Sequence, residues 1–147
     1  ILAFHGAGRR MEYKGDYHGA KVYDDYAHHP DELRATLEAI RGMGDNRLVL
    51  AFQPHTYTRT KLLMDDFVRE LKKADVVILA EIYAARESNT IGISSADLAA
   101  QIPGAIFCET LQDVTACLRE IVRDGDIVVT MGAGDIFRAG EALLAEK

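Results

Sequence analysis

Short, almost wholly apolar runs alternate along most of this chain with longer segments in which apolar residues recur at helical spacing. The apolar runs predict strands at residues 47–52, 75–80, 105–107 and 126–131. The segments between and beside them predict helices at 30–42, 61–74, 95–102, 111–123 and 136–146. In the helix at 61–74, the residues expected to face the core are Leu62, Leu63, Phe67 and Leu71.

The opening segment has a two-residue alternation instead. It places Met11, Tyr13 and Tyr17 on one side of a strand, followed by a turn at His18-Gly19 and a second strand at 20–24. Apolar strands that are separated by helices indicate a parallel sheet covered on both faces. The predicted fold class is therefore α/β: a Rossmann-like open, mostly parallel sheet with helices on both faces and an N-terminal hairpin strand.

Composition and charge exclude some functions. The chain has 147 residues, the usual size of one domain, and 23 acidic against 17 basic residues give a net charge of −6. That charge disfavours general nucleic-acid binding, and no apolar run is long enough to cross a membrane. Cys108 and Cys117 have no CxxC spacing, and two thiols that need not pair fit a reducing cytoplasm. Because the chain begins with Ile and has no signal-peptide pattern, we expect it to be a piece of a longer protein.

Polar side chains follow four of the predicted strands, in loops at 24–32, 53–60, 81–87 and 132–135. Three of the five histidines fall in the first two loops. Ligands of open α/β sheets bind beyond the carboxyl ends of the strands. The sequence therefore predicts a small-molecule site at that edge.

The first of these loops has both functional and structural interpretations. Asp25 could accept hydrogen bonds from ribose hydroxyls or cap the following helix. Tyr26 could stack on a base or fill the sheet edge. His28 and His29 could bind phosphate or metal, although a His-His pair before a proline is a weak signal.

The other candidate residues also have both a functional and a structural interpretation. Arg59, in a loop with His55, could grip a carboxylate or lie in solvent. The Gly132–Gly134 turn could let backbone N–H groups approach an anion or only form a turn. Arg10, next to Arg9, could clamp phosphate or be a solvated basic residue. The chain has no P-loop, GxGxxG or GxSxG pattern, so any main phosphate cradle must lie elsewhere.

Four motifs together carry a family resemblance: GAGRR near the start, DDYAHHPDE at Asp24–Glu32, FQPHTYTRT at Phe52–Thr60 and MGAGDI near the end. With these motifs the whole chain resembles the C-terminal domain of the Mur ligases, above all their L-alanine-adding branch. The resemblance implies bacterial, cytoplasmic, ATP-dependent ligation of L-alanine to UDP-N-acetylmuramate in peptidoglycan synthesis, through an acyl phosphate. It also implies that residues 1–147 form one lid domain, inactive alone, after a UDP-sugar domain and a central ATPase domain that mainly binds ATP and Mg²⁺.

The resemblance also implies roles for individual residues. The residues with implied catalytic roles are Arg10, His28 and Arg59. The residues implied to bind the nucleotide are Asp25 at the ribose, Tyr26, His28, Gly132 and Gly134. His55 and Arg59 would bind the amino acid, and no metal ligand is implied in this chain. Many relatives carry arginine where this chain has Thr56, so the resemblance implies that a second guanidinium is missing here.

Other functions stay open at this point. A murein tripeptide recycling ligase shares the first long motif but resembles FQPHTYTRT poorly. A divalent-metal-dependent hydrolase could use the ligand types of Asp24, Asp25, His28, His29 and His55, although no recognised ligand spacing is present. A phospho-receiver domain would need an aspartate after a central strand and a lysine after a later one. The strand ends at Phe52-Gln53, Ala80-Glu81 and Met131-Gly132 lack both.

Overall fold

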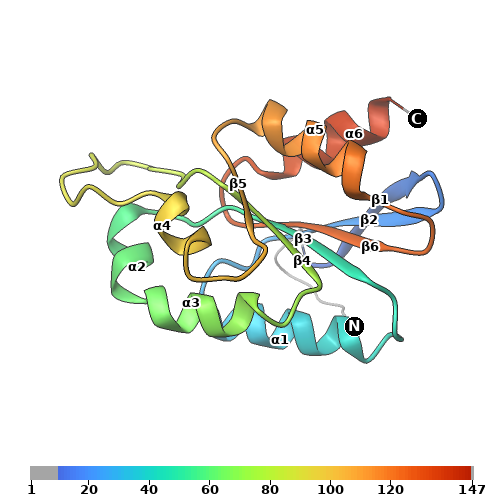
Figure 1. Ribbon diagram of the computed structural model, residues 1–147, viewed down its shortest axis with the longest axis horizontal. Helices are drawn as coiled ribbons and strands as arrows, with labels where there is room; N and C mark the ends of the chain where they lie inside the picture. Colours follow the sequence, from blue (N-terminus) through green and yellow to red (C-terminus); the bar gives the residue numbers. More distant parts are fainter. Residues whose placement is uncertain (1–9, 147) are drawn as a thin grey trace.

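Six strands form one sheet in the order β1-β2-β6-β3-β4-β5 (Figure 1). The computed structural model describes residues 10–146. The strands are β1 (Glu12–Tyr17), β2 (Ala20–Asp25), β3 (Leu48–Phe52), β4 (Val76–Ala80), β5 (Ile106–Cys108) and β6 (Ile127–Met131). The helices are α1 (Pro30–Arg41), α2 (Tyr57–Leu62), α3 (Met64–Leu71), α4 (Ser95–Ala99), α5 (Leu111–Ile121) and α6 (Phe137–Ala145).

Strands β1 and β2 pair antiparallel as a hairpin, and every other neighbouring pair in the sheet is parallel. Helices α1, α3 and α4 cover one face and α5 and α6 cover the other (Figure 1). This arrangement confirms the predicted α/β class, with a mostly parallel sheet and an N-terminal hairpin strand.

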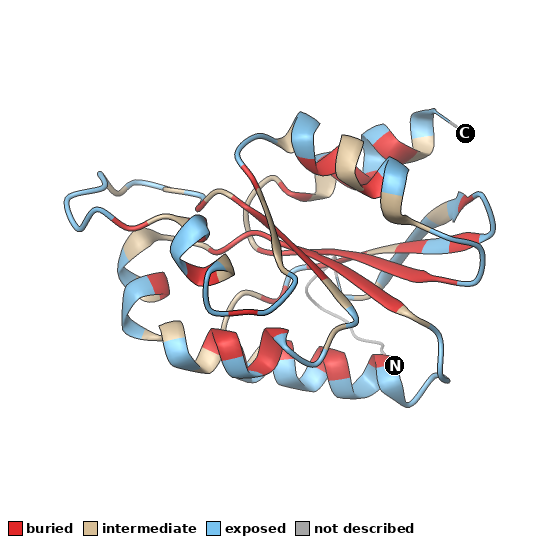
Figure 2. Cartoon of the chain, viewed as in Figure 1, coloured by how far each residue is buried: buried red, intermediate tan, exposed pale blue. Residues whose placement is uncertain are grey.

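The central strands are buried on both faces, which explains why their sequences lack polar alternation. Every residue of β3 and β6 is buried, whereas the outward faces of the helices are exposed (Figure 2). Alternate residues of β3 pack into two separate cores, one under α1 and α3 and one under α5 and α6. Both sides of a central strand therefore need apolar side chains.

The predicted helix at 61–74 is two helices, α2 and α3, that meet at Leu63. Leu63 has φ −109° and ψ 21°, which interrupts the helical path. Phe67 and Leu71 are buried as predicted, and Leu63 packs against the core. The prediction for Leu62 is wrong: this residue is 80% exposed because α2 begins earlier, at Tyr57, and takes its own direction.

A β-bulge in β1 changes the face on which its tyrosines lie. Tyr13 pairs with Tyr23 and Gly15 with Val22, so one extra residue stands in β1 between these pairs. An extra residue reverses which face the next side chains occupy. Tyr13 is therefore 51% exposed while Tyr17 is 3% exposed, and the prediction that both lie on one side is wrong.

Candidate functional site

The loops after β2, β3, β4 and β6 lie at the same edge of the sheet, because the carboxyl ends of parallel strands point the same way. Rings from three of these loops form a continuous row. Tyr26 lies edge-on to His28 with 5.3 Å between ring centroids, and His28 lies 5.7 Å from His55. His55 stacks on Tyr83 at 5.6 Å. The predicted polar loops thus converge on one surface.

Helix α1 begins with its own cap. The Nδ1 atom of His29 accepts a hydrogen bond from the backbone N–H of Asp31 at 3.1 Å. Pro30 follows in the first turn, where its missing N–H costs nothing. His29 is thus the N-terminal cap of α1, the role that the sequence had left open for Asp25.

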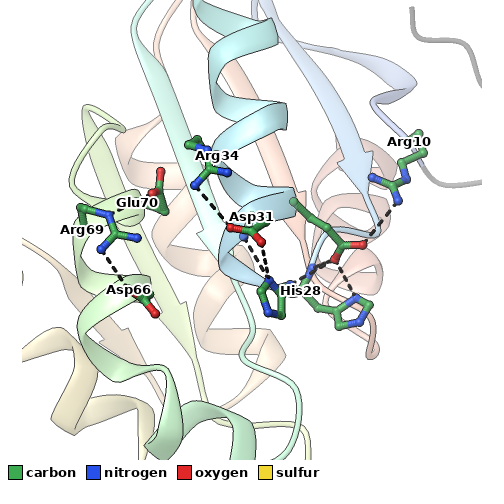
Figure 3. Close-up of polar contacts among 9 residues, drawn as sticks. Arg10, His28, Asp31, Arg34, Asp66, Arg69 and Glu70 are labelled. Carbon is green, nitrogen blue, oxygen red and sulfur yellow. Dashed lines mark hydrogen bonds and ion pairs between the residues drawn. The ribbon is translucent and has the colours of Figure 1, made fainter.

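Glu32 connects two of the predicted site residues. Its Oε1 accepts from the backbone N–H of His28 and of His29, each at 3.1 Å. The same carboxylate lies 3.5 Å from the Arg10 guanidinium and 3.5 Å from His28 Nδ1 (Figure 3). Burial raises the pKa of Glu32, but these hydrogen bonds and charges outweigh it and lower the pKa overall. Sequence reasoning assigned no site role to Glu32, although its position three residues after His29 fits a capping box.

Asp25 is 1% exposed, and its carboxylate is engaged by the chain itself. Oδ1 accepts from the backbone N–H of Ala27 at 2.8 Å, and Oδ2 accepts from the backbone N–H of Met11 at 2.9 Å. The Thr36 hydroxyl donates to Oδ2 at 3.5 Å. Burial raises the pKa of Asp25 and outweighs these hydrogen bonds, which lower it. The carboxylate therefore ties residue 11 to the candidate site, and its role at a ribose stays a prediction.

His55 and Arg59 lie together at the start of α2, with 3.4 Å between His55 Nδ1 and Arg59 Nη1. Burial lowers the pKa of His55, the neighbouring His28 and Arg59 side chains lower it further, and only Glu87 opposes this. His55 is therefore neutral at pH 7, and the guanidinium keeps the positive charge. Within residues 10–146, no carboxylate forms an ion pair with Arg59.

Thr56 caps α2 in an unusual conformation. Its hydroxyl accepts from the backbone N–H of Arg59 at 3.3 Å, and its own φ is +70° with ψ 147°. A β-branched residue rarely adopts a positive φ, and such strain is concentrated at functional sites. The strain supports the assignment of this turn to the site.

The loop after β4 joins the site through contacts that the sequence did not predict. The Thr56 N–H donates to the Tyr83 carbonyl at 2.8 Å, and the Tyr83 N–H donates to the Pro54 carbonyl at 2.9 Å. Glu87 accepts hydrogen bonds from the start of α2. Sequence reasoning included this loop among the four polar loops, but it assigned no role to Tyr83 or Glu87 because no motif singles them out.

Gly132 and Gly134 allow close packing between loops. A Cβ at Gly132 would lie 2.8 Å from the Gln53 carbonyl oxygen, and a Cβ at Gly134 would lie 2.5 Å from Tyr83 Cγ. The Gly132 N–H also donates to the Asp25 carbonyl at 3.0 Å. Gln53 also stabilises this turn, because its side-chain amide donates a hydrogen bond to the Asp135 carboxylate at 2.9 Å. The expected contact of these glycines with nucleotide stays a prediction.

The residues considered for a metal-dependent hydrolase have other contacts. Asp24 is 2% exposed and accepts from the Thr130 hydroxyl at 2.8 Å, while His29 caps α1. In residues 10–146, no three His, Cys, Asp or Glu side chains are grouped so that they could hold a metal ion. The same part of the chain contains no helix that is both long enough and apolar enough to span a bilayer. Arg9 lies outside the described residues.

Known proteins resemble the chain over almost its whole length. Residues 9–134 match the family model described as Mur ligase, glutamate ligase domain. The UDP-N-acetylmuramate–L-alanine ligase of Lachnospira eligens is 50% identical over 145 residues, covering 96% of this chain and 32% of that protein. The protein of the same name from Clostridium novyi is 45% identical and is matched over 100% of this chain and 33% of its own length. The chain thus spans about a third of the length of these curated relatives.

Solved structures share the fold. The UDP-N-acetylmuramate-alanine ligase of Thermotoga maritima superposes with a TM-score of 0.72 at 26% identity, covering 94% of this chain and 29% of that chain. A murein peptide ligase of Psychrobacter arcticus gives 0.72 at 27% identity, covering 97% and 30%. The fold likeness is therefore the same for both kinds of ligase.

Proposed function

Because this chain belongs to the family described as Mur ligase, glutamate ligase domain, we propose that it is the C-terminal lid domain of an ATP-dependent ligase. The reaction would join L-alanine to UDP-N-acetylmuramate in peptidoglycan synthesis, in the bacterial cytoplasm. The identity of 45–50% to ligases of that name favours this reaction over murein peptide ligation, which the fold alone does not distinguish. The UDP-sugar domain and the ATPase domain would belong to the rest of the protein.

One observation carries the proposal. A row of contacts runs along the carboxyl edge of the sheet from Arg10 through Glu32 and His28 to His55 and Arg59. It connects the residues assigned to the nucleotide with those assigned to the amino acid. A ligase needs both ligands in adjacent positions, because the amine of one attacks the carboxyl group activated by the other.

On the nucleotide side, we assign roles to the exposed guanidinium of Arg10 and to the rings of Tyr26 and His28. Arg10 would reach ATP phosphate, while Tyr26 and His28 would line the nucleotide and Asp25 would hold the ribose. Gly132 and Gly134 would close that pocket. ATP, when bound, supplies the phosphoryl group that activates the sugar carboxylate. As the family resemblance implies, we assign Mg²⁺ mainly to the ATPase domain.

On the amino-acid side, Arg59 would pair with the L-alanine carboxylate, with His55 beside it as a neutral neighbour. A guanidinium without a carboxylate partner in the described chain is suited to that task, because Arg binds carboxylates through two parallel hydrogen bonds. Closure of this domain over the central one would exclude water, which would otherwise hydrolyse the acyl phosphate.

The test is an Arg59→Ala substitution in the ligase that contains this domain. We expect the KM for L-alanine to rise at least tenfold while the KM for ATP changes less than twofold. The exposed Arg119 on α5 provides a matched control, and Arg119→Ala should leave both constants unchanged. Equal increases in both constants would remove Arg59 from the amino-acid site. Ligation by the 147-residue chain alone would overturn the lid-domain proposal.

A further inference from the structure

One side chain of the loop between β4 and α4 holds the first turn of α2. Oε1 of Glu87 accepts from the backbone N–H of Tyr57 at 2.7 Å and from that of Thr58 at 3.1 Å. Oε2 accepts from the Thr58 hydroxyl. The first N–H groups of a helix have no partner within the helix and need an acceptor from elsewhere. Glu87 provides that acceptor from 30 positions along the chain.

The helix that Glu87 holds is the one that carries Arg59. Helix α2 has six residues, and helices of this length do not persist without external contacts. Its own cap, the hydroxyl of Thr56, supplies a single hydrogen bond of 3.3 Å. The direction of the Arg59 side chain therefore depends on the loop after β4.

Glu87 also acts on His55, because its negative charge raises the pKa of that imidazole. The groups that act on this imidazole are His28, Arg59 and Glu87, and Tyr83 stacks on its ring. Hydrogen bonds from Thr58 lower the pKa of Glu87, so its carboxylate stays ionised at neutral pH. It is the one negative charge among these groups.

We propose that Glu87 is a positioning residue for the amino-acid side of the site: by holding the first turn of α2, it fixes the direction in which Arg59 presents its guanidinium. Glu87 would not touch the substrate itself. The identity of the ligand at Arg59 rests on the proposed function, whereas the link from Glu87 to α2 rests on the contacts alone.

A first experiment needs no ligase activity. NMR titration of the 147-residue chain would follow the His55 imidazole in the wild type, in Glu87→Gln and in Glu109→Gln. Glu109 is an exposed carboxylate at the same edge of the sheet, after β5, and serves as the matched control. We expect a lower His55 pKa in Glu87→Gln, because the one nearby negative charge is lost, and no change in Glu109→Gln. An unchanged His55 titration in Glu87→Gln would overturn the proposed arrangement.

A second experiment measures steady-state kinetics in the ligase that contains this domain. Glu87→Gln should raise the KM for L-alanine roughly tenfold and the KM for ATP less than twofold, since charged hydrogen bonds are among the stronger ones. In an Arg59→Ala background, Glu87→Gln should add no further increase, because Glu87 acts through Arg59. An unchanged KM for L-alanine in Glu87→Gln, or fully additive effects, would overturn the positioning role. If the wild-type protein did not ligate L-alanine, the proposed function would be wrong. The NMR titration would still test the contact between Glu87 and α2.

Discussion

The substitution Gly134→Ala adds one methyl group and tests whether the glycines after β6 are needed for close packing between loops. A Cβ added to Gly134 would lie 2.5 Å from Tyr83 Cγ and 2.6 Å from Gln53 Oε1. Real Cβ contacts essentially never fall below 3.0 Å, so both neighbours would have to move by about half an ångström. Gly134 does not have a positive φ, so the effect of Gly134→Ala would come from this contact and not from backbone strain.

Neither neighbour is free to move. Tyr83 Cγ is the base of the ring, and the Tyr83 backbone is held by hydrogen bonds to Pro54 and Thr56 at 2.8–2.9 Å. Oε1 of Gln53 accepts from the Ile136 N–H at 3.1 Å at the start of α6. Overpacking of a well-filled region costs typically about 1–3 kcal/mol. We expect Gly134→Ala to lower the free energy of unfolding by about 2 kcal/mol, in the middle of that range.

The assay is urea unfolding of the 147-residue chain followed by circular dichroism. Gly42→Ala is the matched control, because Gly42 ends α1 with φ −69° and a Cβ there would meet its nearest atom, the Ala39 carbonyl oxygen, at 3.4 Å. That substitution should leave stability unchanged or raise it by about 0.5 kcal/mol, through a smaller entropy of the unfolded chain. A Gly134→Ala protein as stable as Gly42→Ala would refute the packing explanation and leave contact with an anion as the reason for this glycine.

Two further predictions concern buried carboxylates. Asp126 is 4% exposed and accepts from Arg47 Nε at 3.0 Å and Nη2 at 2.8 Å, so Asp126→Ala should lower the free energy of unfolding by about 3 kcal/mol in urea titration. A loss below about 1 kcal/mol would show that the pair contributes little. Burial raises the pKa of Glu70, but hydrogen bonds from Lys73 and Arg69 outweigh it and lower the pKa below the ordinary 4.5. This stabilisation is present above pH 4.5 and lost as the pH falls through the lowered pKa, so Glu70→Gln should be less stable than wild type at pH 7, and the difference should shrink as the pH falls below 4.5. A difference that does not change with pH would exclude this linkage.

The sequence predicted the layers and the sheet well because these follow from burial alone. A five-residue run such as Leu48–Phe52 can be apolar throughout only where both of its faces are covered. Once the strands are parallel, the loops that follow them must lie at one edge. The parallel strands therefore predicted that His28 and His55 lie at the same edge of the sheet, but not that their rings are neighbours, because the sequence gives no strand order.

The errors arose where one residue changes a local path. The bulge near Tyr13 reverses a face, and the break at Leu63 turns Leu62 outward, yet neither has a distinct sequence signal. The contacts that complete the site are also non-local. Glu87 reaches α2 across 30 positions and Gln53 reaches Asp135 across 82, and no motif connects such pairs.

The carboxylates of the site have hydrogen-bond partners within the chain, whereas the guanidinium of Arg59 has no carboxylate partner among the described residues. The carboxylates of Asp25 and Glu32 are satisfied by donors from the chain, mostly backbone N–H groups. Arg59 has a neutral imidazole beside it and no ion pair with any carboxylate of residues 10–146. Hydrogen-bonded carboxylates hold the loops in place, while a guanidinium that has no ion pair among the described residues attracts an anionic ligand. A domain that supplies only part of a binding site needs both arrangements. Its loops must be ordered before the ligand binds, and its arginine must be free of a carboxylate partner so that it can bind the ligand.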